Sequence, residues 1–279
     1  FSLRIAPINS AKILLSSIKK IAIKKKTIIV PIDSEHFSIM KLLEQHDLKE
    51  IRRIYLTASG GPFLNLSFSK LKKVKPSQAI KHPKWKMGKK ISIDSASLMN
   101  KILELIEAHK LFSIPIKKLE VIIHPESLVH AIIQLKNGLF KFIYHDTSMI
   151  IPLANAIFDD HLNIEEFFPY NSSFNKSKII QSLNFNKVDI KKFPIIKLKS
   201  RLVEYNSTPI IINAANEVLV DEYLKKKLPF VSFYKLILDV LNDRNYKKYA
   251  IKDPINITQI LEIDQWSRKT IHKKINKYA

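Results

Sequence analysis

TIIVPIDSEH, residues 27–36, joins a short β-branched run to a cluster of polar side chains. The run predicts a buried strand over residues 27–32, bounded by the polar cluster. Open α/β sheets place their sites at the carboxyl ends of their strands. Two further predicted strands, over residues 51–57 and 119–123, also run into polar loops. We therefore expect an α/β domain in which functional residues follow the strands.

Helices account for most of the remaining pattern. Residues 96–112 carry apolar side chains at helical spacing, and Ser95 is placed to cap the amino end of that helix. Toward the carboxyl end, residues 202–224, 230–242 and 257–275 are predicted to be helical, with no strong strand between them. The last part of the chain is therefore expected to be all-α.

A segment rich in Asn, Ser and Lys, with scattered Pro, precedes these last helices and is typical of a linker. We predict a central α/β domain over residues 1–168, a linker over 169–194 and a helical domain over 195–279. The length of 279 residues also favours about two domains at roughly 150 residues each. With 46% hydrophobic and 26% charged residues, the chain can bury a sizeable core.

The composition excludes several classes of protein. No apolar run approaches the roughly 20 residues that cross a bilayer, so a membrane-spanning protein is excluded. The absence of cysteine excludes a disulfide scaffold, a thiolate zinc site and a cysteine nucleophile. Any metal is left to histidine, carboxylate or carbonyl ligands.

The net charge of +22, from 47 Lys and Arg against 25 Asp and Glu, is compatible with a polyanionic partner. Only six of the 47 cations are Arg, whereas bidentate recognition of phosphates and bases favours Arg. The excess of Lys accompanies an excess of Ile and Asn, which indicates a coding bias displayed on solvated surfaces. A phosphorylated small substrate is compatible with either interpretation.

Two groups of polar residues are candidates for binding a metal ion or polar ligand. Asp33 and Glu35 are two apart, so an extended backbone would point both carboxylates to one side, where a divalent cation relieves their repulsion. A solvated strand end is the alternative. Asn100, Lys101 and Glu104 can share one edge of the predicted helix. The alternative there is a surface salt-bridge ladder, to which we assign Glu107.

Two loops are candidates for binding or closing over a substrate. Gly60-Gly61 can turn with positive φ and bring backbone amides and the Ser59 hydroxyl to an anion, or it can be an ordinary turn. Trp85 lies in a polar loop that suits a lid, or it anchors that loop on the core. The histidines, including His36, His130 and His145, show no metal-ligand spacing and are expected to be surface or satisfied residues.

Five segments, in this order, match one enzyme family: PIDSEH at 31–36, LTASGGPF at 56–63, HPKWKMGKKISIDS at 82–95, IHPES at 123–127 and NAANE at 213–217. Together they resemble 1-deoxy-D-xylulose 5-phosphate reductoisomerase, the NADPH-dependent enzyme of the non-mevalonate isoprenoid pathway. The likeness covers nearly the whole chain. It implies conversion of 1-deoxy-D-xylulose 5-phosphate into 2-C-methyl-D-erythritol 4-phosphate, by rearrangement and reduction.

The resemblance also implies a role for each matching residue. Asp33, Glu35 and Glu104 match carboxylates that hold Mg²⁺ or Mn²⁺ and, with His82, form the catalytic set. Substrate-binding positions are matched by Ser34, Glu35, Ser59, His82, Ser95, Asn100, Lys101 and Glu104, of which Ser59, Ser95, Asn100 and Lys101 hold the phosphate. Trp85 and Met87 match a flap over the substrate, and Gly88 matches a contact to NADPH.

The resemblance further implies a homodimer in a bacterial cytoplasm or plastid stroma that binds a phosphorylated small molecule, not nucleic acid or membrane. The family's N-terminal Rossmann-like domain has no match here, so we expect a fragment lacking most of the NADPH-binding domain. Where the family usually has Ala-Asn-Lys-Glu-Ser, this chain has Ala6-Pro7-Ile8-Asn9-Ser10. Two alternatives remain: a decayed remnant that binds metal and phosphosugar without turnover, and a lysine-rich polyanion binder.

Overall fold

The computed structural model describes residues 2–5, 11–83, 87–158, 163, 182–251, 254 and 256–278. The chain forms two compact units, each made of two separate stretches. Unit 1 comprises Phe1–Ser59 and Glu107–Lys187, and unit 2 comprises Gly60–Ile106 and Val188–Ala279. The domains predicted along the chain are consecutive, so they divide it in a different way and stay a prediction. Residues 169–181 of the predicted linker lie outside the described residues.

Unit 1 contains a five-stranded mixed sheet with the strand order β6-β5-β3-β4-β7. Its strands are β3 (Ile51–Ala58), β4 (Leu119–Ile123), β5 (Val129–Leu135), β6 (Phe140–Tyr144) and β7 (Asn186–Lys187). β3 and β4 are parallel, and the other neighbouring pairs are antiparallel. The predicted strands over 51–57 and 119–123 are confirmed as neighbours at the centre of this sheet.

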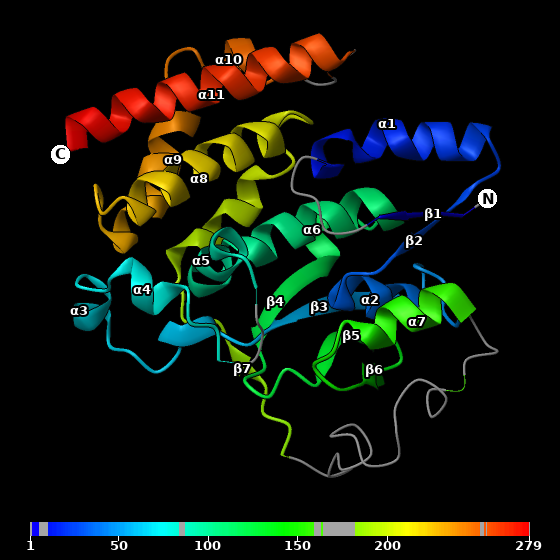
Figure 1. Ribbon diagram of the computed structural model, residues 1–279. Helices are drawn as coiled ribbons and strands as arrows, with labels where there is room; N and C mark the ends of the chain where they lie inside the picture. Colours follow the sequence, from blue (N-terminus) through cyan, green and yellow to red (C-terminus); the bar gives the residue numbers. More distant parts are fainter. Residues whose placement is uncertain are drawn as a thin grey trace. The chain divides into compact units, whose positions relative to one another are not determined.

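A second, two-stranded sheet in unit 1 leads to the polar cluster. β1 (Ser2–Ile5) and β2 (Ile28–Pro31) pair in parallel, and α1 (Ala11–Lys24) connects them (Figure 1). The predicted strand over 27–32 is therefore confirmed, but it does not belong to the sheet of β3 and β4. α2 (Ser34–Leu43) follows β2 and packs on β5 and β6.

Unit 2 is helical, which confirms the prediction for the end of the chain. Its short elements are η1 (Gly61–Phe63), α3 (Phe68–Leu71), α4 (Pro76–Ala79), η5 (Pro194–Arg201), η6 (Phe230–Ser232) and α10 (Tyr246–Tyr249). Its longer helices are α5 (Lys89–Ser97), α8 (Thr208–Leu224), α9 (Phe233–Leu241) and α11 (Ile257–Tyr278). α8 is buried on nearly all sides because α5, α9 and α11 pack against it.

The predicted helix over 96–112 is interrupted. α5 ends at Ser97, Leu98 adopts a left-handed conformation with φ 64°, and α6 (Met99–Phe112) begins afterwards. Ser95 therefore lies inside α5, and its prediction as an N-cap is wrong. The apolar pattern continues across the break because Leu98 and Met99 are both buried. No helix in the described part of the chain is long and apolar enough to span a membrane.

Unit 1 also contains η2 (Ile116–Lys118) before β4 and α7 (Ile150–Phe158) after β6. α6 crosses the boundary of the two units, because the boundary falls between Ile106 and Glu107. A continuous helix is thus shared by both units.

Candidate functional site

The amino end of α2 positions the first predicted metal ligand. Asp33 is the N-cap of this helix, and its Oδ1 accepts hydrogen bonds from the backbone N–H groups of Glu35, at 3.1 Å, and His36, at 3.3 Å. The prediction that Asp33 and Glu35 share one side of an extended strand is wrong, because β2 ends at Pro31 and Glu35 lies in the first helical turn. The two carboxylates still come together, with one oxygen of each within 4.8 Å of the other.

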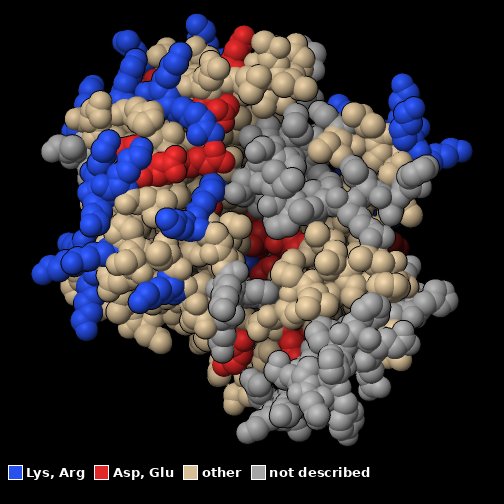
Figure 2. Space-filling model, in the orientation of Figure 1, with Lys and Arg blue, Asp and Glu red and all other residues tan. Residues whose placement is uncertain are grey.

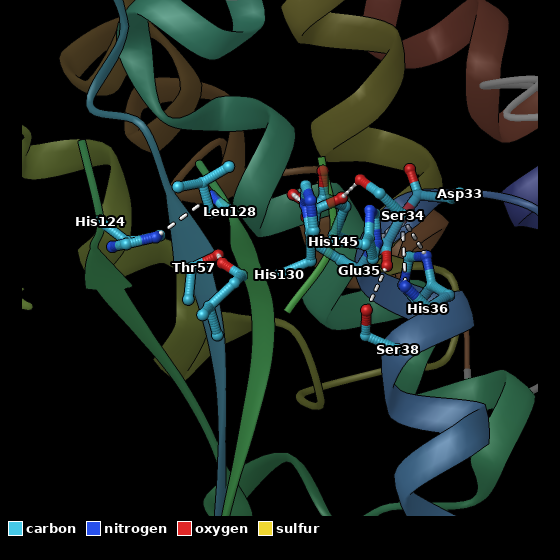
Figure 3. Close-up of polar contacts among 12 residues, drawn as sticks. Asp33, Ser34, Glu35, His36, Ser38, Thr57, His124, Leu128, His130 and His145 are labelled. Atoms are coloured by element: carbon cyan, nitrogen blue, oxygen red, sulfur yellow. Dashed lines mark hydrogen bonds and ion pairs between the residues drawn. The ribbon is translucent and has the colours of Figure 1, made fainter. Parts of the chain in front are cut away.

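Glu35 is held from two sides, as Figure 3 shows. Its Oε2 accepts a 2.6 Å hydrogen bond from the hydroxyl of Ser34. Its Oε1 lies 3.9 Å from Nδ1 of His130 on β5. The side chains of Glu35 and Asp33 are only 12% and 20% exposed, so water screens their mutual repulsion poorly. The positive end of α2 favours both negative charges.

Carboxylate oxygens are the ligands that Mg²⁺ and Mn²⁺ prefer. The residues at the amino end of α2 offer this chemistry in a partly buried place, on a helix that fixes their separation. The donor set therefore fits a hard divalent cation.

His36 lies between two carboxylates in unit 1. Its ring is fully buried, and its Nδ1 lies 2.9 Å from Oδ1 of Asp33 and 3.9 Å from Oε2 of Glu107. The assignment of Glu107 to a surface salt-bridge ladder is therefore wrong, because Glu107 is 9% exposed and faces this histidine. A histidine in this position can orient the carboxylates beside it.

Two further histidines, predicted to be surface or satisfied residues, are buried beside Glu35. His130 and His145 are 2% and 7% exposed, and their rings stack at 4.2 Å. They come from β5 and from the residue after β6, so no spacing along the chain relates them. Only the pairing of Val129 with Tyr144 across the two strands would have indicated their contact.

His124 follows β4 and has a structural role. Its Nδ1 lies 2.9 Å from the carbonyl oxygen of Asn184, and its Nε2 accepts a hydrogen bond from the backbone of Leu128 at 3.2 Å. Burial lowers the pKa of His124. The neutral ring fixes the loop between β4 and β5, which is one of the polar loops predicted to hold functional residues.

In unit 2, Asn100, Lys101 and Glu104 lie along one edge of α6. The carboxylate of Glu104 accepts hydrogen bonds from the amide of Asn100 and from the ammonium of Lys101, the latter at 2.8 Å. The shared edge is confirmed. Glu104 and Lys101 are 1% and 7% exposed, which excludes the alternative of a surface ladder. A buried carboxylate held by an ammonium and an amide is oriented as well as neutralised.

The turn after β3 contains the two glycines. Gly60 and Gly61 have φ values of 80° and 62°, which confirms the predicted positive-φ turn. A Cβ at Gly61 would lie 3.0 Å from the carbonyl oxygen of Ser95, so this turn approaches α5 closely. Ser59, the last residue of the first stretch of unit 1, and Ser95, on α5 in unit 2, are both half-buried.

The remaining predicted residues lie around the amino end of α5. The pKa of His82 is lowered to about 4, mainly by burial and to a smaller extent by the positive charge of Lys101. The His82 ring is therefore neutral near neutral pH. Gly88 is the N-cap residue of α5, and Met87 before it is half-buried. Trp85, the other predicted flap residue, lies outside the described residues.

Two family models match the chain. A model of the 1-deoxy-D-xylulose 5-phosphate reductoisomerase C-terminal domain matches residues 29–112, and a model of the DXP reductoisomerase C-terminal domain matches residues 146–270. The two matches include the amino end of α2, α6 and most of the helical unit.

Individual relatives agree with these models. A 1-deoxy-D-xylulose 5-phosphate reductoisomerase of Pelagibacter ubique is 41% identical over 250 residues, which are 89% of this chain and 63% of the relative. The enzyme of that name from Wolbachia sp. subsp. Drosophila simulans is 40% identical over 266 residues, covering 94% of this chain and 65% of the relative. The chain thus spans somewhat less than two thirds of the length of these relatives.

A solved structure of a DOX-P reductoisomerase in complex with NADPH, fosmidomycin and magnesium is also similar. It superimposes with a TM-score of 0.86 and 31% sequence identity. The match covers 98% of this chain and 69% of that one.

Proposed function

Because the chain belongs to the 1-deoxy-D-xylulose 5-phosphate reductoisomerase family, we propose that it acts in the NADPH-dependent conversion of 1-deoxy-D-xylulose 5-phosphate into 2-C-methyl-D-erythritol 4-phosphate. One observation carries the proposal: the carboxylates of Asp33 and Glu35 lie within 4.8 Å of each other at a partly buried helix end. Asp33 and Glu35 would hold a divalent cation there, which would supply electrostatic stabilisation for negative charge on the substrate oxygens.

The third carboxylate of the proposed site is Glu104. It precedes Glu107 by three residues on the continuous helix α6, a rise of about 4.5 Å. Glu107 lies beside His36 in the first turn of α2. Residues three apart share one face of a helix, so Glu104 and Glu107 are neighbours on α6. Asn100 and Lys101 hold the Glu104 carboxylate in one orientation.

The phosphate of the substrate is proposed to bind to Ser59, Ser95, Asn100 and Lys101. These side chains supply hydroxyl, amide and ammonium donors without Arg, and charge-assisted hydrogen bonds of this type are the strong ones. The close approach of Gly61 to α5 supports the proposal, because it fixes the turn that follows Ser59 beside Ser95.

The remaining roles concern the carbon chain and the coenzyme. The neutral His82 ring is proposed to hydrogen-bond the substrate, together with Ser34, whose hydroxyl already orients Glu35. NADPH supplies the hydride for the reduction when it is bound, and Gly88 is proposed to contact it. A Cβ at Gly88 would meet nothing within 4 Å, so a ligand can approach its backbone closely. Met87 and Trp85 are proposed to cover the substrate and exclude water.

Binding of Mn²⁺ tests this proposal directly. We expect the purified protein to bind one Mn²⁺, measured by electron paramagnetic resonance, and Glu104→Gln to weaken that binding by about tenfold or more. Glu44→Gln is the matched control, since Glu44 lies at the other end of α2 with its side chain 51% exposed. Fosmidomycin should bind only when Mn²⁺ is present.

Three outcomes are informative. Binding of Mn²⁺ that Glu104→Gln leaves unchanged contradicts the proposed ligand set. Fosmidomycin binding without Mn²⁺ contradicts the proposed substrate site. Metal-dependent binding of fosmidomycin supports the proposed site with or without NADPH oxidation, because this chain is expected to lack most of the NADPH-binding domain.

The protein is further proposed to form a homodimer through β6. This strand lies at one edge of the five-stranded sheet, and it exposes Phe140 by 55%, Phe142 by 44% and Tyr144 by 36%. An edge strand with an exposed aromatic face is suited to pairing with another chain. The location, in a bacterial cytoplasm or a plastid stroma, stays a prediction.

Polyanion binding is a second candidate function, favoured by one cavity in unit 2. The cavity, of about 810 Å³, lies between α10 and the end of α11, and Tyr249 and Trp266 stack in its wall at 4.7 Å. Its basic lining residues are Arg244, Lys248, Lys269, Lys273, Lys274 and Lys277. Figure 2 shows Lys and Arg side chains gathered around this end of α11.

The salt dependence of binding distinguishes the two functions. A polyanion binder should bind nonspecific DNA with an affinity that falls steeply as salt rises, and Lys273→Glu should weaken it. Lys81→Glu, at an exposed residue outside the cavity, is the control. The absence of such binding leaves only the enzyme and its remnant.

A further inference from the structure

The ring of His145 has two aromatic neighbours in unit 1. One face stacks on His130, with ring centroids 4.2 Å apart and an interplanar angle of 18°. Phe37 of α2 contacts it edge-on at 6.3 Å. The backbone N–H of His145 donates a 3.0 Å hydrogen bond to the carbonyl oxygen of Leu128. These contacts hold the His145 ring beside His130.

His130 links the His145 ring to Glu35, a proposed metal ligand. Its Nδ1 lies 3.9 Å from Oε1 of Glu35, while Ser34 donates to the other oxygen of that carboxylate. His130 is buried on β5, and Glu35 is in the first turn of α2. Figure 3 shows His145, His130 and Glu35 grouped at this end of α2. A change in the tilt of the His130 ring would alter what the carboxylate of Glu35 meets.

His145 contributes a ring and no charge to this arrangement. Its Nδ1 lies 2.8 Å from the carbonyl oxygen of Asp146, which can only accept, so Nδ1 carries the proton. Burial lowers the pKa of His145 to about 4, with the neighbouring His130 as the second cause. Its contact with His130 is therefore ring packing between the stacked side chains, and another flat ring can replace it.

We propose that His145 is a positioning residue that holds the His130 ring against Glu35 and thereby sets the orientation of this carboxylate toward the divalent cation. The inference rests on the proposed function, in which Glu35 is a metal ligand. His145 is not one of the proposed ligands of the ion or the substrate. Residues that orient metal ligands typically change metal affinity by 10- to 100-fold when they are removed.

Two variants separate ring packing from general stability. His145→Ala removes the ring, and we expect it to weaken Mn²⁺ binding by about tenfold. His145→Phe keeps a flat ring without the hydrogen bond to Asp146, and we expect it to restore the affinity to within about threefold of the original. His109→Ala is the matched control, because His109 also contacts a backbone carbonyl oxygen, that of Ile114 at 2.7 Å. It should leave Mn²⁺ affinity unchanged.

The coupling of His145 to His130 is tested by a double-mutant cycle. If His145 acts through His130, His145→Ala should have no further effect on Mn²⁺ affinity in a His130→Ala background. Additive losses overturn the proposal, and so does an affinity in His145→Phe as low as in His145→Ala. A His145→Ala variant that is less stable but binds Mn²⁺ normally also overturns it. His145→Leu, which keeps apolar volume, replaces the alanine variant if the latter does not fold.

A measurement without metal separates this proposal from the proposed function. We expect a nuclear Overhauser effect between the His130 ring and the γ-methylene protons of Glu35 in the metal-free protein and in His145→Phe. The signal should disappear in His145→Ala, and its persistence there overturns the positioning role. If the original protein binds no Mn²⁺, the proposed function fails, whereas this measurement still decides what His145 does.

Discussion

The side-chain amide of Asn216 donates a 2.7 Å hydrogen bond to Oδ1 of Asp94 and joins α8 to α5. Both residues are buried, and Lys90 donates to the other oxygen of Asp94 at 2.8 Å. α5 carries Ser95, a proposed phosphate ligand, immediately after Asp94. The segment NAANE at 213–217, which matches the family, therefore fixes the helix beneath the proposed phosphate site.

Asn216→Ala should destabilise the protein. The substitution leaves a buried carboxylate oxygen of Asp94 without its donor, which costs about 1 to 3 kcal/mol in the free energy of unfolding. Urea unfolding measures the change. Asn276→Ala, at an exposed position of α11, should stay within about 0.5 kcal/mol of the original protein. Equal effects of the two variants would contradict the assigned role of the hydrogen bond.

Asp33 is the N-cap of α2 and a proposed metal ligand, and different substitutions separate the two roles. Asn caps a helix as well as Asp does, so Asp33→Asn should keep the stability of the metal-free protein while lowering Mn²⁺ affinity by about tenfold or more. Asp33→Ala should lower the affinity and also cost about 1 kcal/mol of stability. Thermal unfolding and Mn²⁺ titration of the same samples measure both effects. Normal Mn²⁺ binding by Asp33→Asn would remove Asp33 from the ligand set.

His82 makes stability depend on pH. Its pKa is about 4 in the folded protein against 6.5 ordinarily, so the unfolded chain takes up the proton first as the pH falls. This residue contributes full stability above pH 6.5, and the contribution is lost progressively as the pH falls toward 4. His82→Gln should flatten the curve of unfolding free energy over that interval. His272→Gln, exposed on α11, should not, and an unchanged curve in His82→Gln would contradict the cause.

Alanine substitutions at Gly61 and Gly138 distinguish the cost of backbone strain from the cost of steric overlap. Both have positive φ, 62° and 92°, but a Cβ at Gly61 would press on Ala96 and Ser95 at 3.0 Å, whereas one at Gly138 would meet nothing within 4 Å. We expect Gly138→Ala to cost about 1 kcal/mol and Gly61→Ala about 2 to 4 kcal/mol, by urea unfolding. Similar losses of unfolding free energy in the two variants would show that the backbone of α5 at Ser95 moves to make room for the added Cβ.

Phe142 tests the proposed dimer. Phe142→Lys places a charge on the exposed face of the edge strand β6, and charged residues on such strands oppose pairing. Light scattering after size exclusion should give a dimer for the original protein and a monomer for the variant. Ile257→Lys, at a residue that is 62% exposed in unit 2, should leave the dimer intact. A monomeric original protein would contradict the homodimer.

The sequence predicted what local patterns determine. The strands over 51–57 and 119–123 and the helices at the carboxyl end carry continuous apolar or periodic patterns, and the structure contains them. The polar edge of α6 was predictable because residues three and four apart on a helix are neighbours. The break at Leu98 was not, since buried residues on both sides keep the apolar pattern uninterrupted.

The surroundings of the proposed metal ligands depend on contacts distant in the chain. His130 and His145 come from β5 and the end of β6, and each looks isolated in the sequence, whereas His36 lies in the same cluster as Asp33. Their proximity follows from strand register and from the packing of α2 on β5 and β6. Glu107 was assigned to the surface for the same reason, because its helical position alone does not reveal that it faces His36.

The N-cap role of Asp33 has an evolutionary consequence. In a copy released from selection for catalysis, the helix cap would still preserve an oxygen-bearing side chain at Asp33, so retention of that residue carries little information about activity. Glu35 lies in the first turn of α2, where its interaction with the helix dipole is worth about 0.5 kcal/mol. If Glu35 is the metal ligand proposed above, its loss in a related chain would therefore be a clearer sign of lost metal binding than the loss of Asp33.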